Sequence, residues 1–272
     1  MKLRIILTAL AIIIATLTSA AQNITAEKGK VKNSYNFWKY TPAGAATDSV
    51  GKPLIVFLHG ASLCGRNMER VKRYGTIDAI SKGRSLDAYV IAPQNPGGAW
   101  SPRKVIGLVD YMIKNNKIDT TRIYVMGMSL GGYGTLDVAA AYPDRFAAAI
   151  GICGGATGDN LAGLAKIPLW IIHGTADRAV TVQQSDRVVK AVEAARQPGD
   201  TVQRLVYDRV KGMNHGRPAR LLYSSEVYDW LLGHRLNEAG RPIHPTPEIN
   251  DNMLRHCYDG LKMPSRRSRR RR

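Results

Sequence analysis

The sequence predicts an α/β fold with a doubly wound, mostly parallel sheet. Short, continuous apolar runs alternate with helical segments along most of the 272 residues, and one of these runs leads directly into a serine framed by glycines. A continuous apolar run is typical of a central parallel strand that is covered on both faces. Strands that alternate with helices imply right-handed crossovers. The chain is long enough to bury a full core in one domain.

The strands are expected in an order that places the apolar runs at the centre of the sheet. Residues 32–40 alternate polar and aromatic side chains and predict an antiparallel edge strand. Continuous apolar runs predict parallel strands at 54–59, 88–92, 122–126, 147–153 and 169–173, and a late strand is expected at 203–207.

The helices are expected between these strands, at 77–81, 102–115, 129–142 and 182–195, with a last helix at 219–232. After Gly233 the chain becomes rich in proline, asparagine and arginine, and it predicts an irregular extension over 234–272 with a short helix near 253–258. The link between the strands at 147–153 and 169–173 is short, so there is little material for a lid.

The N-terminal segment, residues 1–21, has the pattern of a secretory signal peptide. Lys2 and Arg4 precede an apolar run over 5–17, and small residues follow it. The apolar run is short for a bilayer span, which needs about 20 residues. We expect cleavage to leave a secreted or periplasmic domain over 22–233, with an uncleaved anchor as the alternative.

The C-terminus carries one third of the formal net charge of +18. Six arginines fall within residues 266–272, and without them the net charge falls from +18 to +12, spread along the chain. Specific nucleic-acid recognition is not expected, because no nucleic-acid-binding module accompanies the charge. A block of like charges repels itself, so the tail over 264–272 is expected to be disordered.

The three cysteines, Cys64, Cys153 and Cys257, are too few for a disulfide scaffold. Cys64 follows the His59-Gly60 turn and Cys153 ends a predicted strand, so both are expected near the same edge of the sheet. A disulfide between them is one interpretation. Two small buried thiols are favoured, because free cysteine packs as a small core residue.

Residues 123–132 read Ile-Tyr-Val-Met-Gly-Met-Ser-Leu-Gly-Gly, an apolar strand that runs into a serine and then into a helix. This context is that of a nucleophile elbow, in which a sharp, strained turn raises the serine hydroxyl above the sheet. Gly127 and Gly131 lack the side chains that would keep neighbouring segments apart. The sequence therefore predicts that Ser129 is a catalytic nucleophile.

A serine hydroxyl needs a base to take its proton and a carboxylate to orient that base. Asp177 lies in the turn after the strand at 169–173, and His215 lies in a glycine-flanked loop after the late strand. The chain order of serine, acid and histidine is that of α/β-hydrolases. The remaining candidates are placed less well: Asp159, Asp186 and Asp208 as acid, and His59 and His173, which more plausibly brace loops.

Two backbone amides are expected to bind the oxyanion of the tetrahedral intermediate. One is the amide of Leu130, next to the nucleophile. The other is the amide of Ala61 in the loop after the strand at 54–59, with Ser62 as the neighbouring alternative. Trp100 lies in a loop over the same edge, where it forms either a wall of the substrate site or a part of the core.

Together, six motifs resemble the secreted esterases of the α/β-hydrolase superfamily. They are His59-Gly60, the Trp100 loop, Gly-Met-Ser-Leu-Gly-Gly-Tyr-Gly at 127–134, Ile-Cys-Gly-Gly at 152–155, His-Gly-Thr-Ala-Asp at 173–177 and Asn-His-Gly at 214–216. The most similar groups are of the polyhydroxybutyrate depolymerase, feruloyl esterase and acetylxylan esterase type, with the phospholipase/carboxylesterase group close to them. The resemblance covers residues 54–232.

The resemblance implies an α/β-hydrolase fold with little or no lid, and hydrolysis of carboxylic esters through an acyl-enzyme. Water is then the second substrate, no cofactor or metal is needed, and the substrate is a small-molecule or polysaccharide-linked ester, such as an acetyl or feruloyl ester. No integral membrane association is expected. The alternatives are a serine peptidase of the same fold and a non-catalytic protein that binds anionic polymers through its basic tail.

Overall fold

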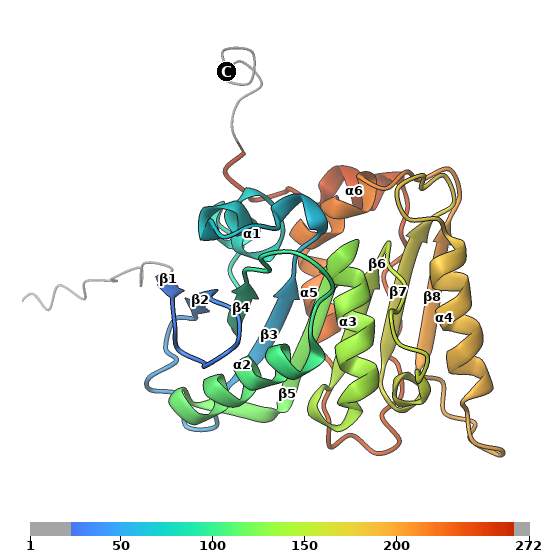
Figure 1. Ribbon diagram of the computed structural model, residues 1–272, viewed down its shortest axis with the longest axis horizontal. Coiled ribbons are helices and arrows are strands. Elements are labelled where there is room, and N and C mark those ends of the chain that lie inside the picture. The colour runs from blue at the N-terminus through green and yellow to red at the C-terminus, as the bar shows by residue number, and fades with distance from the viewer. Residues whose placement is uncertain (1–22, 264–272) are drawn as a thin grey trace, which may run out of the picture.

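The computed structural model describes residues 23–263, which form an eight-stranded sheet flanked by helices (Figure 1). The sheet order is β1-β2-β4-β3-β5-β6-β7-β8. The strands are β1 (Asn23–Glu27), β2 (Phe37–Thr41), β3 (Lys52–Leu58), β4 (Tyr89–Pro93), β5 (Ile118–Met128), β6 (Ala148–Ile152), β7 (Leu169–Gly174) and β8 (Leu205–Val210). All neighbours from β4 to β8 pair in parallel, and β2 joins β1 and β4 by antiparallel pairing. The predicted signal peptide and arginine-rich tail lie outside the described residues.

The helices cover both faces of the sheet. The α-helices are α1 (Thr76–Ser81), α2 (Pro102–Asn115), α3 (Leu130–Ala141), α4 (Gln183–Ala194), α5 (Ser225–Leu232) and α6 (Asp251–His256). Short 3₁₀-helices lie at η1 (Ala61–Leu63), η2 (Met68–Arg73), η3 (Pro143–Arg145), η4 (Ala162–Lys166) and η5 (Arg217–Tyr223). Figure 1 shows α2, α3 and α4 in front of the sheet and α5 behind it.

The alternation of side chains along β3 divides the core into two clusters. Leu54, Val56 and Leu58 pack with residues of α2 and α3 on one face. Ile55 and Phe57 pack with residues of α1, α5 and α6 on the other. Because successive side chains of a strand point to opposite faces, a continuous apolar run supplies both layers at once. The doubly wound α/β sheet predicted from these runs is confirmed.

Two predicted elements differ from the structure. The first predicted strand is shorter, and the edge of the sheet is formed by β1, which has no apolar run because its residues are exposed or half-buried. The last predicted helix is interrupted at Ser224, whose extended backbone separates η5 from α5. Ser224 is a residue type that favours the N-terminal boundary of a helix, and the apolar pattern continues through it.

The C-terminal extension after Gly233 packs firmly on the sheet and its helices, although it is irregular except for α6. The His234 ring is fully buried: Nδ1 donates to Trp230 O at 2.9 Å, and Nε2 accepts from the His244 amide at 3.1 Å. Further along, Met253 and Leu254 of α6 are buried in the core cluster that contains α1 and α5.

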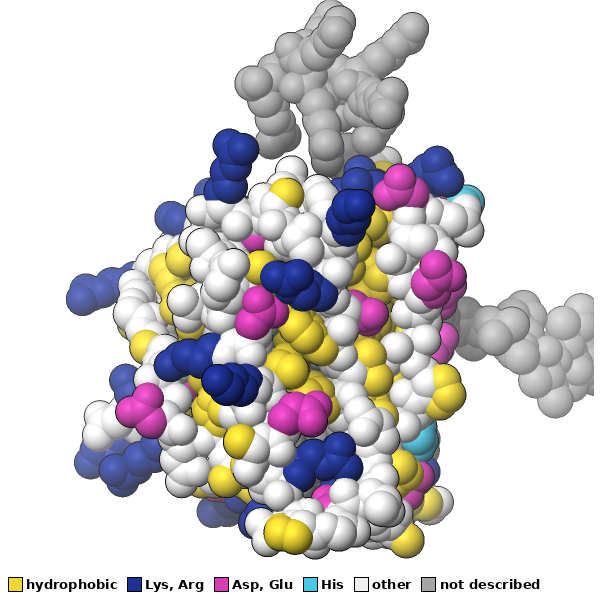
Figure 2. All heavy atoms as spheres, turned by 90° about the vertical axis from the view of Figure 1, so that its right-hand side faces the viewer, with side chains coloured by type: hydrophobic (Ala, Val, Ile, Leu, Met, Phe, Trp, Pro, Cys, Tyr) yellow, Lys and Arg dark blue, Asp and Glu magenta, His cyan; other side chains and the backbone are white. Residues whose placement is uncertain are grey.

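The surface of the described residues shows no dense basic stripe on the face next to β8 and α4. Figure 2 shows lysine and arginine side chains on this face separated by acidic and uncharged groups. None of the helices within residues 23–263 has both the length and the apolar character needed to cross a bilayer.

We predict that the extension is needed for stability. A chain that ends at Gly233 loses the burial of His234, Met253 and Leu254, and each large apolar side chain contributes about 1.5–3 kcal/mol. The truncated chain should therefore unfold at a lower urea concentration, with a loss of at least about 3 kcal/mol. A chain that ends at Met263 is the control and should match the full-length chain. Equal urea midpoints for the chains ending at 233 and 263 would contradict the prediction.

Candidate active site

Ser129 lies at a sharp turn between β5 and α3. Its backbone has φ 59° and ψ −124°, a left-handed φ that costs a residue with a side chain on the order of 1–3 kcal/mol. The amide of Ser129 donates to Ile152 O of the neighbouring strand β6 at 2.8 Å, which anchors the turn to the sheet. The backbone geometry is therefore that of the predicted nucleophile elbow.

The turn depends on glycines because three backbone segments cross there. A Cβ atom on Gly131 would lie 1.8 Å from Leu58 O, and one on Gly127 would lie 2.4 Å from Gly131 O. Real Cβ atoms essentially never come closer than 3.0 Å to another heavy atom. No L side chain fits at Gly127 or Gly131 without displacing the end of β3.

Asp177 lies in the turn that follows β7, with its side chain fully buried. Its Oδ1 accepts from the amides of Ala179 and Val180, both at 2.9 Å, and its Oδ2 lies 2.6 Å from Nδ1 of His215. Burial raises the pKa of Asp177, but the hydrogen bonds from His215 and from the two amides outweigh it and hold the pKa below its usual range. The carboxylate is therefore ionised at neutral pH.

His215, in the loop between β8 and η5, connects the acid to the serine. Its Nδ1 lies 2.6 Å from Asp177 Oδ2, and its Nε2 lies 2.9 Å from Ser129 Oγ. Because the carboxylate only accepts, Nδ1 carries the proton and Nε2 is free to accept the proton of the Ser129 hydroxyl. The structure thus brings together the three residues predicted from the sequence, which are 38 and 86 positions apart along the chain.

The other candidate acids are engaged elsewhere. Asp208 accepts from Trp170 Nε1 at 2.6 Å, and burial raises its pKa. Asp186 accepts from the Tyr207 hydroxyl at 2.7 Å. Neither of these two carboxylates contacts His215, so Asp177 is the acid of the hydrogen-bonded chain.

The two predicted oxyanion-binding segments lie beside the serine. Ala61 and Leu130 line the same pocket as Ser129 and His215. Within residues 23–263, neither of their amides donates to a protein acceptor, so both are available to a ligand. Ser62 also lines the pocket, and it remains the neighbouring alternative to Ala61.

His59 braces the loop that carries Ala61, as the sequence predicted. Its ring is fully buried, with Nδ1 2.8 Å from Gly60 O and Nε2 accepting from the Asn95 amide at 3.1 Å. Because Gly60 O only accepts, the proton is on Nδ1. The ring therefore ties the loop after β3 to the loop after β4.

The pocket above the serine has a volume of about 580 Å³ and mainly apolar walls. A cavity of this size holds a small organic molecule. Besides the residues already named, its lining consists of Gly60, Tyr74, Met128, Tyr133, Ala179, Val180, Gly216 and Ala219. Tyr133 could have been found from the sequence, because it lies one helical turn after Ser129. Tyr74 carries no comparable signal, because the irregular loop between η2 and α1 places it.

Trp100 does not form a wall of this pocket. Its side chain is 3% exposed, and its ring packs edge-on against Tyr35 and His59 with centroid separations of 5.1 Å. A Cβ atom on Gly134 would lie 2.5 Å from the indole, so the first turns of α3 hold Trp100 in the core. Trp100 is therefore a core residue, which is one of its two predicted roles. The other predicted role, substrate binding, is wrong. A loop above the correct sheet edge does not specify whether its tryptophan points inward.

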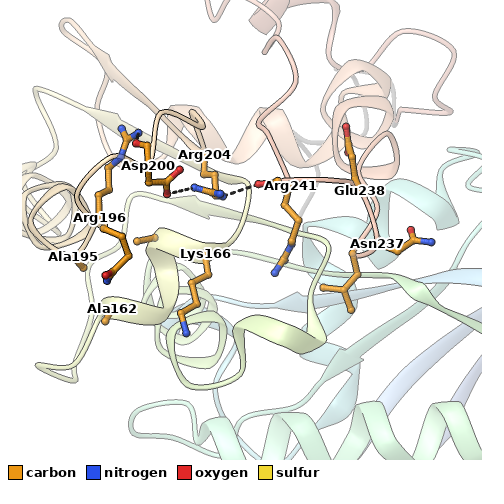
Figure 3. Close-up of a pocket in the computed structure, with 13 residues that line it drawn as sticks. Ala162, Lys166, Ala195, Arg196, Asp200, Arg204, Asn237, Glu238 and Arg241 are labelled. Carbon is orange, nitrogen blue, oxygen red and sulfur yellow. Dashed lines mark hydrogen bonds and ion pairs between the residues drawn. The ribbon is translucent and has the colours of Figure 1, made fainter.

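A second cavity, about 480 Å³, lies away from the serine (Figure 3). Its walls come from η4, the end of α4 and the C-terminal extension, and they contain arginines but no histidine, serine or cysteine. Arg204 pairs with Asp200 at 2.5 Å and donates to Gly240 O, and Arg241 donates to Pro143 O and Phe146 O. These arginines satisfy backbone carbonyls and join the extension to the core.

The cysteines are free thiols: Cys153 and Cys257 are buried, and Cys64 is half-buried. Cys153, His173 and Asp177 could offer one metal ligand each, with ligand atoms within 4.8 Å of one another. However, burial raises the pKa of the Cys153 thiol to about 12, and protein hydrogen bonds occupy both Asp177 oxygens and both His173 nitrogens. This chemistry does not suit a metal ion, which needs deprotonated, available ligands.

The arrangement of the sheet, the flanking helices and the elbow defines the α/β-hydrolase fold, which solved structures share. A thermostable esterase matches 78% of this chain and 63% of its own chain, with 26% identity and a TM-score of 0.67. The feruloyl esterase module from Clostridium thermocellum matches 84% of this chain and 92% of its own chain, with 14% identity and a TM-score of 0.57. An acylaminoacyl peptidase from Pyrococcus horikoshii matches 86% of this chain and 43% of its own chain, with 14% identity and a TM-score of 0.53.

Sequence comparisons give relatives of the kinds that the motifs resemble. The model of the prolyl oligopeptidase family matches residues 94–157. Poly(3-hydroxyalkanoate) depolymerase C of Paucimonas lemoignei is 29% identical over an alignment of 164 residues that covers 53% of this chain and 37% of the relative. A bifunctional acetylxylan esterase/xylanase of Neocallimastix patriciarum is 27% identical over an alignment of 164 residues that covers 56% of this chain and 22% of the relative. The chain thus spans well under half of the curated relatives it matches.

We predict that Gly131→Ala strongly destabilises the fold. The added methyl group would meet Leu58 O, and overpacking of this kind costs about 1–3 kcal/mol or more. Gly107→Ala is the matched control, because its Cβ meets only Val31 at 3.8 Å within α2, where alanine is favoured over glycine by about 1 kcal/mol. Thermal unfolding should show a lower Tm for the first variant and an equal or higher Tm for the second. A Gly131→Ala variant as stable as the native protein would contradict the crossing described above.

Proposed function

We propose that this protein is a secreted serine esterase that hydrolyses carboxylic esters through an acyl-enzyme. The observation that carries the proposal is the hydrogen-bonded chain from Asp177 through His215 to Ser129, which opens into a mainly apolar pocket. The names of the similar proteins, among them a poly(3-hydroxyalkanoate) depolymerase and an acetylxylan esterase, support ester hydrolysis.

In the first half of the reaction, His215 Nε2 takes the proton of the Ser129 hydroxyl as Oγ attacks the ester carbonyl carbon. The carbonyl π bond breaks, and the oxygen receives the negative charge. The imidazolium then gives its proton to the leaving alkoxide oxygen, and the alcohol departs. Asp177 remains ionised throughout and orients the ring.

In the second half, His215 takes a proton from water, and the hydroxide oxygen attacks the acyl carbon. Collapse of the second tetrahedral intermediate returns the proton to Ser129 Oγ and releases the carboxylic acid. The amides of Ala61 and Leu130 donate to the oxyanion in both halves. Each such donor typically contributes about 3 kcal/mol to the transition state.

The substrate is proposed to be a small acyl or aryl ester, including acetyl or feruloyl esters attached to polysaccharides. The side chains of Met128, Leu130 and Val180 favour an apolar acyl or aryl group, and the lining contains no lysine, arginine, aspartate or glutamate that would bind a charged one. None of the residues that line the pocket belongs to 153–168, the link between β6 and β7, so this link leaves room for an ester attached to a larger molecule.

A peptidase of the same fold is the second candidate, favoured by the match of residues 94–157 to the prolyl oligopeptidase family. That match includes Ser129 but ends before Asp177 and His215. It therefore supports the elbow, which esterases and peptidases of this fold share, more than it supports amide hydrolysis.

The esterase proposal predicts that Ser129→Ala abolishes hydrolysis of p-nitrophenyl acetate. Removing the nucleophile of a complete triad lowers kcat by about 10⁴-fold or more. Ser62→Ala is the matched control, because this serine lines the same pocket but does not contact His215, and it should retain most of the activity. Substantial turnover by Ser129→Ala, measured spectrophotometrically after purification from an esterase-free host, would refute the proposal.

The acid should be as important as the nucleophile. Asp177→Asn keeps the size of the side chain but leaves His215 Nδ1 beside an amide, which disfavours the required tautomer, so kcat should fall by about 10⁴-fold. In the native protein, kcat/KM should fall toward acidic pH as His215 takes a proton, because only the neutral ring acts as a base. A pH profile that stays flat from pH 8 to pH 4.5 would contradict this role of His215.

Esterase and peptidase are separated by comparing one acyl group on two leaving groups. We expect kcat/KM for an acyl p-nitrophenyl ester to exceed that for the matching p-nitroanilide by far. The oxyanion amides and the triad serve both reactions, so the ratio reports the leaving group, through its intrinsic reactivity and its fit to the pocket. A higher kcat/KM for an aminoacyl nitroanilide would establish the peptidase.

A further inference from the structure

A second histidine contacts the acid of the triad from the side opposite His215. His173 is the last residue but one of β7, and its ring is fully buried. Its Nε2 lies 3.3 Å from Asp177 Oδ2, the oxygen that His215 also contacts. It also lies 2.9 Å from Val180 O. The carboxylate oxygen and the carbonyl both only accept, so Nε2 must carry a proton.

The other side of the ring is fixed as well. His173 Nδ1 lies 2.7 Å from Ser185 Oγ of α4, and the same Oγ lies 2.8 Å from Gly154 O. Because Nε2 carries the proton of the neutral ring, Nδ1 accepts the single hydroxyl proton of Ser185. Ser185 is also fully buried. The ring is therefore held by α4 and by the loop after β6, and it cannot turn away from Asp177 without losing these contacts.

These contacts fix both ends of the turn from Asp177 to Val180. Asp177 Oδ1 accepts from the amide of Val180, and His173 donates to the carbonyl of the same residue. Val180 also lines the substrate pocket, whereas His173 does not. His173 is thus placed to control where the carboxylate points and how its charge is shared, without touching the substrate.

We propose that His173 is a positioning residue for the proposed serine esterase: its Nε2–H, bonded to Val180 O and 3.3 Å from Asp177 Oδ2, holds the turn that carries the carboxylate and draws part of its negative charge away from His215. This inference rests on the proposed function, because it assigns a role within the Ser129-His215-Asp177 mechanism. A donor that stabilises the carboxylate weakens the hold of that carboxylate on the His215 proton.

Two further side chains, Cys153 and Tyr133, lie beside the pair. The Cys153 thiol of β6 also hydrogen-bonds to Asp177, and burial raises the pKa of this thiol to about 12, so it remains neutral. Tyr133 of α3 interacts electrostatically with Asp177 and with Arg187 of α4. Burial is the main reason that the pKa of Tyr133 is raised above its usual value. Both Cys153 and Tyr133 are therefore uncharged near neutral pH.

Two variants of His173 separate the contact with Asp177 from the contact with Ser185. Glutamine can place an amide nitrogen where Nε2 lies and keep the donor to Asp177. Asparagine reaches only the position of Nδ1, so it keeps the contact with Ser185 and leaves Asp177 without the donor. Both replacements are neutral and polar, so they differ mainly in which contact they retain.

We expect His173→Asn to lower kcat for p-nitrophenyl acetate by about 10- to 100-fold, the range for a misplaced catalytic group, with little change in KM. The acidic limb of its kcat/KM profile should move to higher pH, because Asp177 then holds the His215 proton more strongly. His173→Gln should keep most of kcat and an unshifted limb. Equal losses in both variants with unshifted limbs would overturn the proposal and leave a structural role.

A control and a second variant keep the test decisive. His234→Asn and His234→Gln alter another fully buried histidine that contacts two backbone groups away from the pocket, and they should lower Tm without moving the pH profile. If His173→Asn does not fold, Ser185→Ala releases Nδ1 while keeping the ring. It should lower kcat by a smaller factor and move the acidic limb in the same direction. An unchanged profile in Ser185→Ala would then count against the proposal.

A measurement without substrate distinguishes this inference from the proposed function. The proton between His215 Nδ1 and Asp177 should give a low-field NMR signal in the native protein, and this signal should move to lower field in His173→Asn and remain in place in His173→Gln. If the native protein has no esterase activity, the proposed function fails, whatever the NMR signal does. If the native protein is active but the signal is the same in both variants, only the role of His173 fails.

Discussion

The close crossing of the elbow with the end of β3 is the constraint on which the rest of the site depends. Gly127 and Gly131 let the backbone of β5 and α3 pass against Leu58 O at distances that no side chain allows. The crossing holds Ser129 at a left-handed φ that it would not adopt alone. It also fixes where β3 ends, and with it the loop that presents Ala61. One contact thus sets the distance between the nucleophile and the proposed oxyanion amides.

The parallel sheet extends this constraint to the acid and the base. The carboxyl ends of parallel strands meet at one edge of the sheet, so turns after β5, β7 and β8 come together although they are far apart in sequence. Asp177 is then fixed by its own turn through two backbone amides, while His215 is held mainly by Asp177 itself. The sheet and its turns thus fix the serine and the acid directly, and they fix the proposed base mainly through the acid.

Much of the fold and of the site could be predicted because each depends on local patterns. Continuous apolar runs identified the central strands, and the glycine-framed Ser129, the turn with Asp177 and the loop with His215 stand at fixed places after such runs. The edge strand β1 could not be predicted, because a half-exposed strand needs no apolar run. The orientation of Trp100 depends on Gly134, Tyr35 and His59, which are distant in sequence, so the loop that carries it does not reveal whether the indole faces the core or the substrate.

The same distinction applies to the histidines, of which the sequence separated one catalytic candidate from two that brace loops. His59 and His173 are both fully buried, His59 directly after β3 and His173 near the end of β7, and each contacts a group or loop of the proposed catalytic site. His59 holds the carbonyl before Ala61, and His173 holds the carboxylate of Asp177. A buried ring whose two nitrogens are both hydrogen-bonded has one allowed orientation, so it holds the loop that it contacts in a fixed position relative to the sheet. A histidine that holds a loop can therefore also affect the proposed catalysis, because these two loops position the groups proposed to stabilise the transition state.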